Sequence, residues 1–457
     1  MAVIAVVIFG TGMVLGKLIL SPTPTSKSCQ DMKNTPGTGL EISYGGQILQ
    51  TDTNSCKKAG TQAFASGNYN DALNNFKLSL QKNSNDPEAL IYLNNAKARQ
   101  QGKWLRIAVS VPTSIEPNLA EEILRGVAQA QDEVNNNNGI NGKLLQVAIA
   151  NDDEKPGTPT KIAKALVQDQ EVLGVVGATS SNATLEEGKV YNTEGLVAIS
   201  PTSTSVNISN FSRYVFRTVF SDELAADKLA NYMVKNLHTK KAAVFFVFGS
   251  SYSKSLKDEF VKAVQKQSKV LNVPEFDLSK SNFNAETAVK QAISQNAKVL
   301  MLASDSETLD KAYQVIQAAK NSNLDILGGD NIFSLETLNS QGKQAEGMVV
   351  AVPWYIGNVS NSNFVNNSKK LWKATVNWRT ATAYDATQAI AEGLKQSNTR
   401  DKLQKTLHSP DFSVEGATGK IQFSPSGDRI NNNIFLVKVQ QKAGKEEYEF
   451  VPIQPQF

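Results

Sequence analysis

Short apolar runs alternate with amphipathic segments along most of the chain. The runs are rich in valine, alanine and isoleucine, and they comprise Leu105–Val111, Leu144–Ala150, Val172–Val176, Leu196–Ile199 and stretches that begin at Ala243, Val299 and Ile326. Between them, segments such as Glu121–Val134 carry apolar residues at helical spacing. This alternation predicts parallel sheets built from strand–helix–strand units. A region of roughly 350 residues is too long for one sheet with one core, so we expect two lobes.

Two of these runs end in loops rich in small hydroxyl residues. Val172–Val176 leads into Gly177–Thr184, and the next apolar run leads into Ser200–Ser205. Ligands of open α/β sheets lie beyond the carboxyl ends of adjacent strands, and a helix that starts there offers free N–H groups to an anion. The pair of loops therefore predicts a site for a carboxylate or another anion. The alternative is that Ser181 and Thr202 only cap helices.

The segment 57–102 has a helical pattern of its own. Tyr69–Lys82 places its apolar residues on one face, and Asp86 followed by Pro87 is typical of a helix start. The order of glycines, aromatic residues and alanines resembles a tetratricopeptide repeat of one and a half units. A lone repeat cannot bury a solenoid core, so it must pack on the main body, on the membrane-proximal segment or on a partner. The alternative is a plain helical spacer.

The amino-terminal stretch Ala2–Leu20 is apolar apart from Thr11 and Lys17. It is long enough to span a bilayer core of roughly 30 Å. It lacks a basic leader and a following A-x-A site, which favours an uncleaved membrane anchor over a removed signal peptide. Residues 21–56 are expected to form a linker. Within it, Cys29 and Cys56 either pair as a disulfide or remain free thiols.

Composition excludes several classes of function. The 457 residues are 40% hydrophobic and 20% charged, with a formal net charge of +4, which fits a soluble globular body. No basic run with interleaved aromatic residues suggests nucleic-acid binding. Two histidines and two cysteines leave almost no zinc chemistry, so we expect no metal and no cofactor. No G-x-S-x-G, H-E-x-x-H or phosphate-loop motif occurs, and we expect no enzymatic activity.

Several motifs occur in the order found in one known family. They are Asn138–Lys143 before the second strand, Tyr214–Thr218, Tyr384–Ala386 and the G-x-T-G-x-x-x-F…G-D pattern within 416–428. From about residue 105 to 437 the chain resembles type I periplasmic solute-binding proteins, in particular the leucine/isoleucine/valine-binding branch of amino-acid ABC import. The resemblance implies an α/β fold of two lobes, with parallel sheets flanked by helices, around a ligand cleft. This body would follow the small all-α module and one transmembrane helix.

The resemblance also implies where the chain crosses between lobes. We expect crossings near Val219, Val350 and Gly416. Lobe 1 would then comprise 104–219 and 350–415, and lobe 2 would comprise 220–349 and 416–457. Closure about such hinges buries the solute.

The resemblance places candidate ligand-binding residues. Those matching the family positions for the α-carboxylate are Ser180, Ser181, Thr202, Ser203 and Thr204. Tyr252 matches an aromatic residue that closes over the ligand, although it could instead pack on Leu256. An amino acid also needs an acceptor for its ammonium group. Asp305, which follows the apolar run Val299–Leu302, is the expected acceptor and Asp330 is its competitor, although either could only cap a helix. Trp354 either lines the side-chain pocket or packs within a lobe.

The family's first loop usually carries a glycine-rich P-x-S-G stretch, whereas this chain has Pro112–Pro117. This departure leaves the identity of the solute open. We expect a non-catalytic receptor for an amino acid or a related amide, which delivers it to the permease of an ABC importer. It would face the periplasm of a bacterium, anchored to the inner membrane by its first helix, as in some cyanobacterial members. The alternative is an extracytoplasmic sensory domain with a separate signalling partner.

Overall fold

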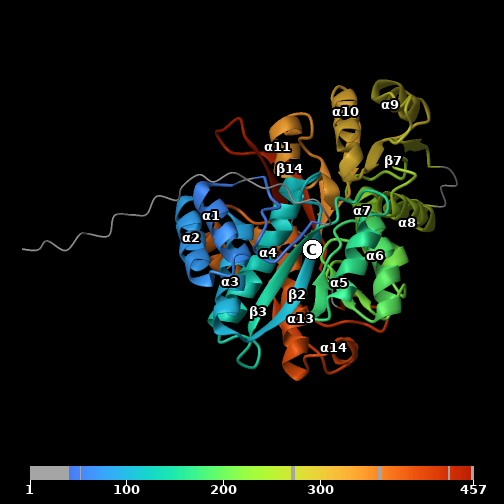
Figure 1. The fold of residues 1–457 in the computed structure, drawn as a ribbon. Coiled ribbons are helices and arrows are strands. Elements are labelled where there is room, and N and C mark those ends of the chain that lie inside the picture. Colours follow the sequence, from blue (N-terminus) through green and yellow to red (C-terminus); the bar gives the residue numbers. More distant parts are fainter. Residues whose placement is uncertain (1–40, 52, 269–272, 359–362, 431–432, 454–457) are drawn as a thin grey trace, which may run out of the picture.

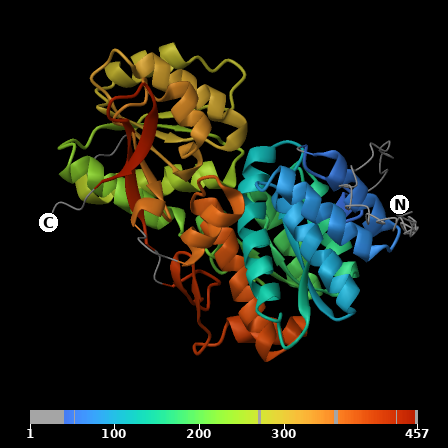
Figure 2. The same cartoon turned by 90° about the vertical axis from the view of Figure 1, so that its left-hand side faces the viewer.

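The computed structural model describes residues 41–453 except 52, 269–272, 359–362 and 431–432. These residues form two α/β lobes that lie side by side (Figures 1 and 2). The predicted alternation of strands and helices is confirmed, as is the two-lobed architecture. In Figure 2 the first lobe contains cyan and green elements and the orange helices α13 and α14, and the second contains the yellow elements and the red carboxy-terminal strands.

The first lobe is built on a six-stranded sheet of order β1-β3-β2-β4-β5-β6. Its strands are β1 (Ile42–Ser43), β2 (Trp104–Val111), β3 (Leu144–Asn151), β4 (Val172–Val176), β5 (Val197–Ser200) and β6 (Val215–Arg217). Only β1 is antiparallel, pairing with the edge of β3. The helices of this lobe are α4 (Pro117–Asn136), α5 (Thr158–Gln168), α6 (Ser181–Glu194), α12 (Asn363–Trp372), α13 (Trp378–Gln396) and α14 (Arg400–Leu407).

The second lobe is built on a seven-stranded sheet of order β15-β14-β11-β10-β9-β7-β8. Its strands are β7 (Ala242–Phe246), β8 (Glu275–Asp277), β9 (Val299–Ala303), β10 (Asp325–Gly328), β11 (Val349–Val352), β14 (Phe435–Gln441) and β15 (Tyr448–Pro452). Its helices are α7 (Asp222–Lys235), α8 (Ser251–Ser268), α9 (Ala285–Ser294), α10 (Leu309–Ala319) and α11 (Leu335–Gln341). Strands β7, β9 and β11 consist of buried apolar residues throughout, as expected for strands covered on both faces.

The chain crosses between the lobes at places that differ in part from those expected. The first crossing follows β6, before α7. Strand β11 pairs with β10, so the second crossing follows Val352 rather than preceding Val350. The hairpin of β12 (Val414–Gly416) and β13 (Gly419–Ile421) is held on α13, because Asp385 accepts a hydrogen bond from Ala417 N and pairs with Arg429. The third crossing therefore lies between Arg429 and β14, not at residue 416.

The helical module comprises α1 (Ser55–Ala65), α2 (Tyr69–Lys82) and α3 (Pro87–Gln101). The predicted helix start is confirmed, because Asp86 accepts a hydrogen bond from Ala89 N and Pro87 is the first helical residue. Helix α3 lies against β3 and α4 of the first lobe (Figure 1). Asn95 there exchanges two hydrogen bonds with the backbone of Val147, at 2.7 and 2.9 Å. The module thus packs on the main body, while its likeness to a tetratricopeptide repeat stays a prediction.

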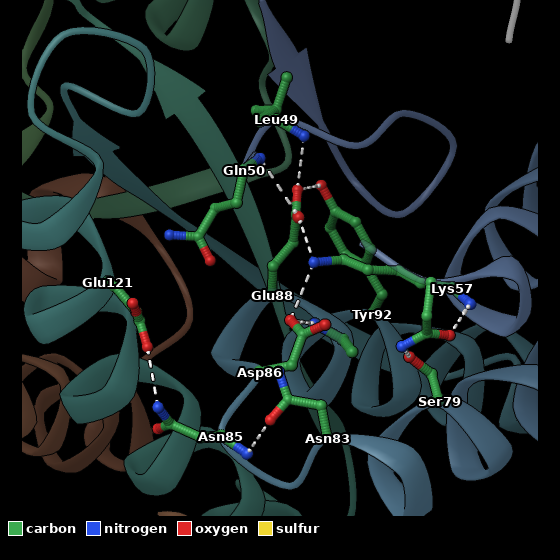
Figure 3. Close-up of polar contacts among 12 residues, drawn as sticks. Leu49, Gln50, Lys57, Ser79, Asn83, Asn85, Asp86, Glu88, Tyr92 and Glu121 are labelled. Atoms are coloured by element: carbon green, nitrogen blue, oxygen red, sulfur yellow. Dashed lines mark hydrogen bonds and ion pairs between the residues drawn. The ribbon is translucent and has the colours of Figure 1, made fainter. Parts of the chain in front are cut away.

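A buried ion triad joins the parts of this module (Figure 3). The ammonium nitrogen of Lys57 lies 2.9 Å from Asp86 and 2.8 Å from Glu88, and the Lys57 side chain is fully buried. Glu88 also accepts hydrogen bonds from Leu49 N and from the Tyr92 hydroxyl. Burial lowers the pKa of Lys57, but the two carboxylates outweigh it and hold that pKa above its usual value. The triad therefore links α1, α3 and the loop before them.

Two expectations concern residues before position 41. No helix within the described ranges is long and apolar enough to cross a membrane, and the predicted anchor at 1–20 lies outside those ranges. Cys56 is buried and disulfide-bonded. Cys29 also lies outside the described residues.

Candidate ligand-binding site

A cavity of about 530 Å³ lies between the two lobes. It is bordered by the loops that follow β4 and β5 in the first lobe and β7, β9 and β10 in the second. These are the carboxyl ends of parallel strands, where ligands of such sheets bind. Six of the sequence-predicted residues line it, namely Ser180, Ser181, Thr202, Tyr252, Asp305 and Asp330. Ser203, Thr204 and Trp354 do not.

The hydroxyl groups of the two loops are partly engaged already. Ser180 Oγ accepts a hydrogen bond from Ala183 N and thereby caps α6, a role that the alternative interpretation had given to Ser181. Thr202 Oγ1 donates to Thr179 O at 2.6 Å. Ser181 Oγ accepts from Ser205 N at 3.3 Å, an interaction that leaves its own proton available to a ligand. Of the hydroxyls predicted to hold a carboxylate, Ser181 is therefore the best placed donor.

Residues behind these loops fix their shape. Arg217, whose side chain is fully buried, donates to the carbonyl oxygens of Thr204 and Ser205, each at 2.9 Å. It also pairs with Asp428 at 2.6 Å. Ser203 and Thr204 are buried beneath the cavity wall, so their part is to support the loop rather than to line the cavity. Arg217 belongs to the quoted family motif, but its role as a clamp on this loop required the structure.

Tyr252 and Asp330 form the second-lobe side of the cavity. Asp330 is 5% exposed, and burial raises its pKa, against the opposing influence of the Tyr252 hydroxyl and Arg379. Burial and the neighbouring Asp330 likewise raise the pKa of Tyr252 well above its usual value. A Cβ atom at Gly329 would collide with the Tyr252 hydroxyl. Because Gly329, directly after β10, has no side chain, the Tyr252 hydroxyl can lie beside Asp330.

Asp305 lies at the cavity, as expected, whereas Trp354 does not. Asp305 lines the cavity, and its Oδ1 accepts hydrogen bonds from Thr308 N and Thr308 Oγ1 at 3.1 and 2.8 Å. It therefore caps the turn that begins α10 as well as facing the cavity. Trp354 is 2% exposed, lies outside the cavity wall and packs edge-on against Phe364. Trp354 therefore packs within the protein and does not line the pocket.

Sequence reasoning missed several residues that line the cavity. They are Glu116, Leu119, Glu154, Phe248, Glu307, Trp378 and Arg379. Glu154 is notable, because its carboxylate accepts hydrogen bonds from Ser180 N and Thr179 Oγ1 and so occupies part of the predicted anion site at the start of α6. Its position just after β3 was a signal that could have identified it. Trp378 begins α13 and does not follow a strand, so its place in the sequence gave no indication that it lies at the cavity.

Direct hydrogen bonds join the two lobes on both sides of the cavity. Asn182, at the start of α6, accepts from Ser251 N at 2.7 Å and donates to Gly249 O at 3.1 Å. Arg379, on α13, donates to Phe333 O at 3.0 Å and pairs with Glu122 at 3.4 Å. These contacts hold the lobes together around the cavity.

A buried pair of carboxyl groups lies behind the cavity in the first lobe. Ser110 Oγ is 3.0 Å from Asp152 Oδ2 and 2.7 Å from Glu187 Oε1, and both acids are fully buried. Burial raises the pKa of Glu187 to about 8 and that of Asp152 well above its usual value. The Asp152 carboxyl in turn accepts from Glu154 N at 3.3 Å. The protonation state of Asp152 and Glu187 therefore affects the hydrogen bond that holds the loop carrying Glu154.

Replacing Glu187 with glutamine is expected to flatten the pH dependence of stability. The folded pKa of about 8 exceeds the unfolded value of about 4.3, so the stabilising contribution is complete below pH ~4.3 and is lost as pH rises through about 8. One such proton corresponds to about 1.4 kcal/mol per pH unit. Urea unfolding at pH 6 and pH 7 measures this slope. Glu194→Gln, on the exposed end of the same helix, should keep the parent slope. An unchanged slope in Glu187→Gln would contradict this assignment.

Comparisons with known proteins agree with this fold. The sequence profile of the family described as "Periplasmic binding protein" matches residues 106–445. An amino acid binding protein of Pseudomonas aeruginosa is 31% identical over 140 residues, which are 30% of this chain and 37% of that protein. A Leu/Ile/Val-binding protein homolog of Brucella melitensis is 23% identical over 70% of this chain and 86% of its own length.

A solved leucine-binding protein from Thermotoga maritima has the same fold. Its structure superposes with a TM-score of 0.67 at 20% identity, over 77% of this chain and 99% of that protein.

Proposed function

Because this chain belongs to the periplasmic binding protein family, we propose that it is a receptor that binds an amino acid between its lobes and performs no chemistry on it. The single observation that carries the proposal is the inter-lobe cavity with complementary ends. The Ser181 hydroxyl lies on one side, and the Tyr252–Asp330 pair lies on the other. A zwitterion offers a carboxylate to the first and an ammonium group to the second. The printed names of the Pseudomonas and Brucella relatives support this ligand class.

The proposal extends to transport. Receptors with this cleft present a closed, ligand-bound form to a membrane partner. We assign this chain to delivery of the amino acid to an ABC permease at the periplasmic face of the inner membrane, with residues 1–20 as its anchor. The helical module, packed on the first lobe, would then hold the cleft near the membrane. No observation on the described residues favours the sensory alternative.

Replacing Ser181 with alanine is expected to weaken amino-acid binding about tenfold or more without unfolding the protein. A hydroxyl that donates to a carboxylate contributes on the order of 1.5–3 kcal/mol, and about 1.4 kcal/mol corresponds to tenfold in Kd. Calorimetric titration of the protein with the common amino acids identifies the ligand. The same titration then compares the Kd of the parent with that of the variants. Ser294→Ala, on the exposed face of α9, is the matched control.

The same titration tests the proposed function. Binding of sugars or nucleobases, with none of any amino acid, would refute it. Equal affinity of the parent and Ser181→Ala for the amino acid would show that the hydroxyl loops are structural.

A further inference from the structure

Acidic side chains outnumber basic ones in the wall of the cavity. Its wall contains one cationic side chain, Arg379, and five carboxyl groups, those of Glu116, Glu154, Asp305, Glu307 and Asp330. Five negative charges and one positive charge give a formal sum of −4. An amino acid with a neutral side chain adds a net charge of zero and leaves this sum unchanged.

Four of these acids gather in one part of the cavity and are named here the carboxylate cluster: Glu116, Glu154, Asp305 and Glu307. The charge of Glu116 interacts with those of Glu154 and Asp305, and Glu154 interacts with Glu307. Two members come from the first lobe and two from the second, so like charges face each other across the cleft. Burial, and then Glu154, raises the pKa of Glu116 to about 7. Closing the cleft therefore brings together groups that repel each other unless a cation lies between them.

The protein itself compensates the cluster only weakly. Arg379 is directed to Glu122 and to the carbonyl oxygens of Phe333 and Asp330. Neutral donors reach Glu154 from Thr179 and Ser180. The cluster also does not converge as metal ligands do, since the described residues contain no group of acids, histidines and cysteines that could hold a metal ion. An extended organic cation fits such a spread of carboxylates better than a point charge.

Aromatic residues beside the cluster supply an independent indication of a ligand. The cavity wall includes Phe248, Tyr252 and Trp378, and aromatic faces attract organic cations. The guanidinium group of Arg379 already lies over the Trp378 ring, 4.6 Å from its centroid, so Phe248 and Tyr252 are the aromatic residues left for a ligand cation. Trp378 is 2% exposed, and its indole N–H has no acceptor among the described residues. A buried indole N–H ordinarily has a partner. The indole N–H groups of Trp354 and Trp372 also have no acceptor among the described residues, so this feature of Trp378 does not by itself indicate a ligand.

We propose that the solute is an amino acid with a cationic side chain, of the class of lysine, ornithine and arginine, whose side-chain cation binds the carboxylate cluster. This proposal rests on the proposed function and names its substrate class. The α-ammonium group faces Asp330 and Tyr252, and the second cation lies between the acids of the two lobes. A branched apolar side chain in that place would remove water from the carboxylates without supplying a hydrogen bond or a positive charge to replace it. The cluster thus selects for the cation and against leucine, isoleucine and valine.

Pairs of ligands that differ only in the cation test this proposal. Calorimetric titrations compare L-lysine with L-norleucine, which lacks the ε-ammonium group, and L-arginine with the neutral L-citrulline. The cationic member of each pair is expected to bind ~100-fold more tightly, because each buried charge pair is a strong, charge-assisted contact. Leucine or norleucine binding more tightly than lysine would overturn the substrate class while leaving an amino-acid receptor. Putrescine binding as tightly as lysine would overturn both proposals, since it has no carboxylate.

A double variant locates the effect in the cleft. Glu116→Gln combined with Glu154→Gln is expected to weaken lysine binding at least ~30-fold and to reduce the preference of lysine over norleucine by a similar factor. Glu286→Gln, exposed on α9, is the matched control and should bind as the parent does. Circular dichroism and thermal unfolding establish that the double variant is folded. An unchanged preference for lysine in a folded double variant would overturn the assignment of the cluster.

Discussion

Replacing Asp330 with asparagine is expected to weaken amino-acid binding by roughly two to three and a half orders of magnitude. Asp330 is 5% exposed and lies beside the Tyr252 hydroxyl in the wall of the cavity. Removing its charge leaves the ammonium group of the ligand buried without an anionic partner, at a cost of roughly 3–5 kcal/mol. At about 1.4 kcal/mol for each tenfold change, Kd rises by that factor. Calorimetric titration with the tightest binder among the common amino acids measures it.

Asp305→Asn is the comparison that separates the two aspartates. Asp305 also lines the cavity, but its carboxylate is already engaged by the backbone and hydroxyl of Thr308. It is also less buried than Asp330, so its replacement should cost less affinity. If Asp330→Asn binds the amino acid as the parent does while Asp305→Asn does not, the ammonium group binds at Asp305, and its assignment to Asp330 is wrong. Both variants are expected to unfold at temperatures close to that of the parent.

Replacing Lys57 with methionine is expected to unfold the helical module at a cost of roughly 3–5 kcal/mol. The Lys57 side chain is fully buried between Asp86 and Glu88, so its loss leaves two carboxyl groups in the interior without a cation (Figure 3). Protonation of either acid would recover only part of this energy. Because Glu88 also binds Leu49 N and Tyr92, the effect should spread to the preceding loop. Hydrogen exchange of the amides in α1–α3, together with thermal unfolding, measures it.

Lys77→Met on the exposed face of α2 is the matched control for this change. It removes the same charge from the same module without exposing a buried carboxylate, and it should alter stability by at most a few tenths of a kcal/mol. Equal protection of α1–α3 in Lys57→Met and the parent would show that the triad does not hold the module in place.

Local patterns in the sequence were enough to define the elements. Buried valine-rich runs, helix caps such as Asp86 and the hydroxyl loops at strand ends depend on residues close together in the chain, and the structure confirms them. The motifs also identified the fold and the edge of the sheet where the cavity lies. Six candidate residues reached that cavity because each follows a strand whose end is fixed by its own apolar run.

Tertiary structure decided the lobe boundaries and the chemistry of the cavity. A buried apolar strand does not indicate which sheet it joins, so the place of β11 was fixed only by its pairing with β10. The sequence does not distinguish Trp354 from Trp378 as a residue of the cavity wall, yet Trp378 lines the cavity and Trp354 does not. Glu116, Glu154 and Glu307 stand in separate segments of the chain, and only the packing of the two lobes brings them to one cavity. Short-range preferences determine helices and strands, whereas a site between lobes depends on packing between residues that are distant along the chain.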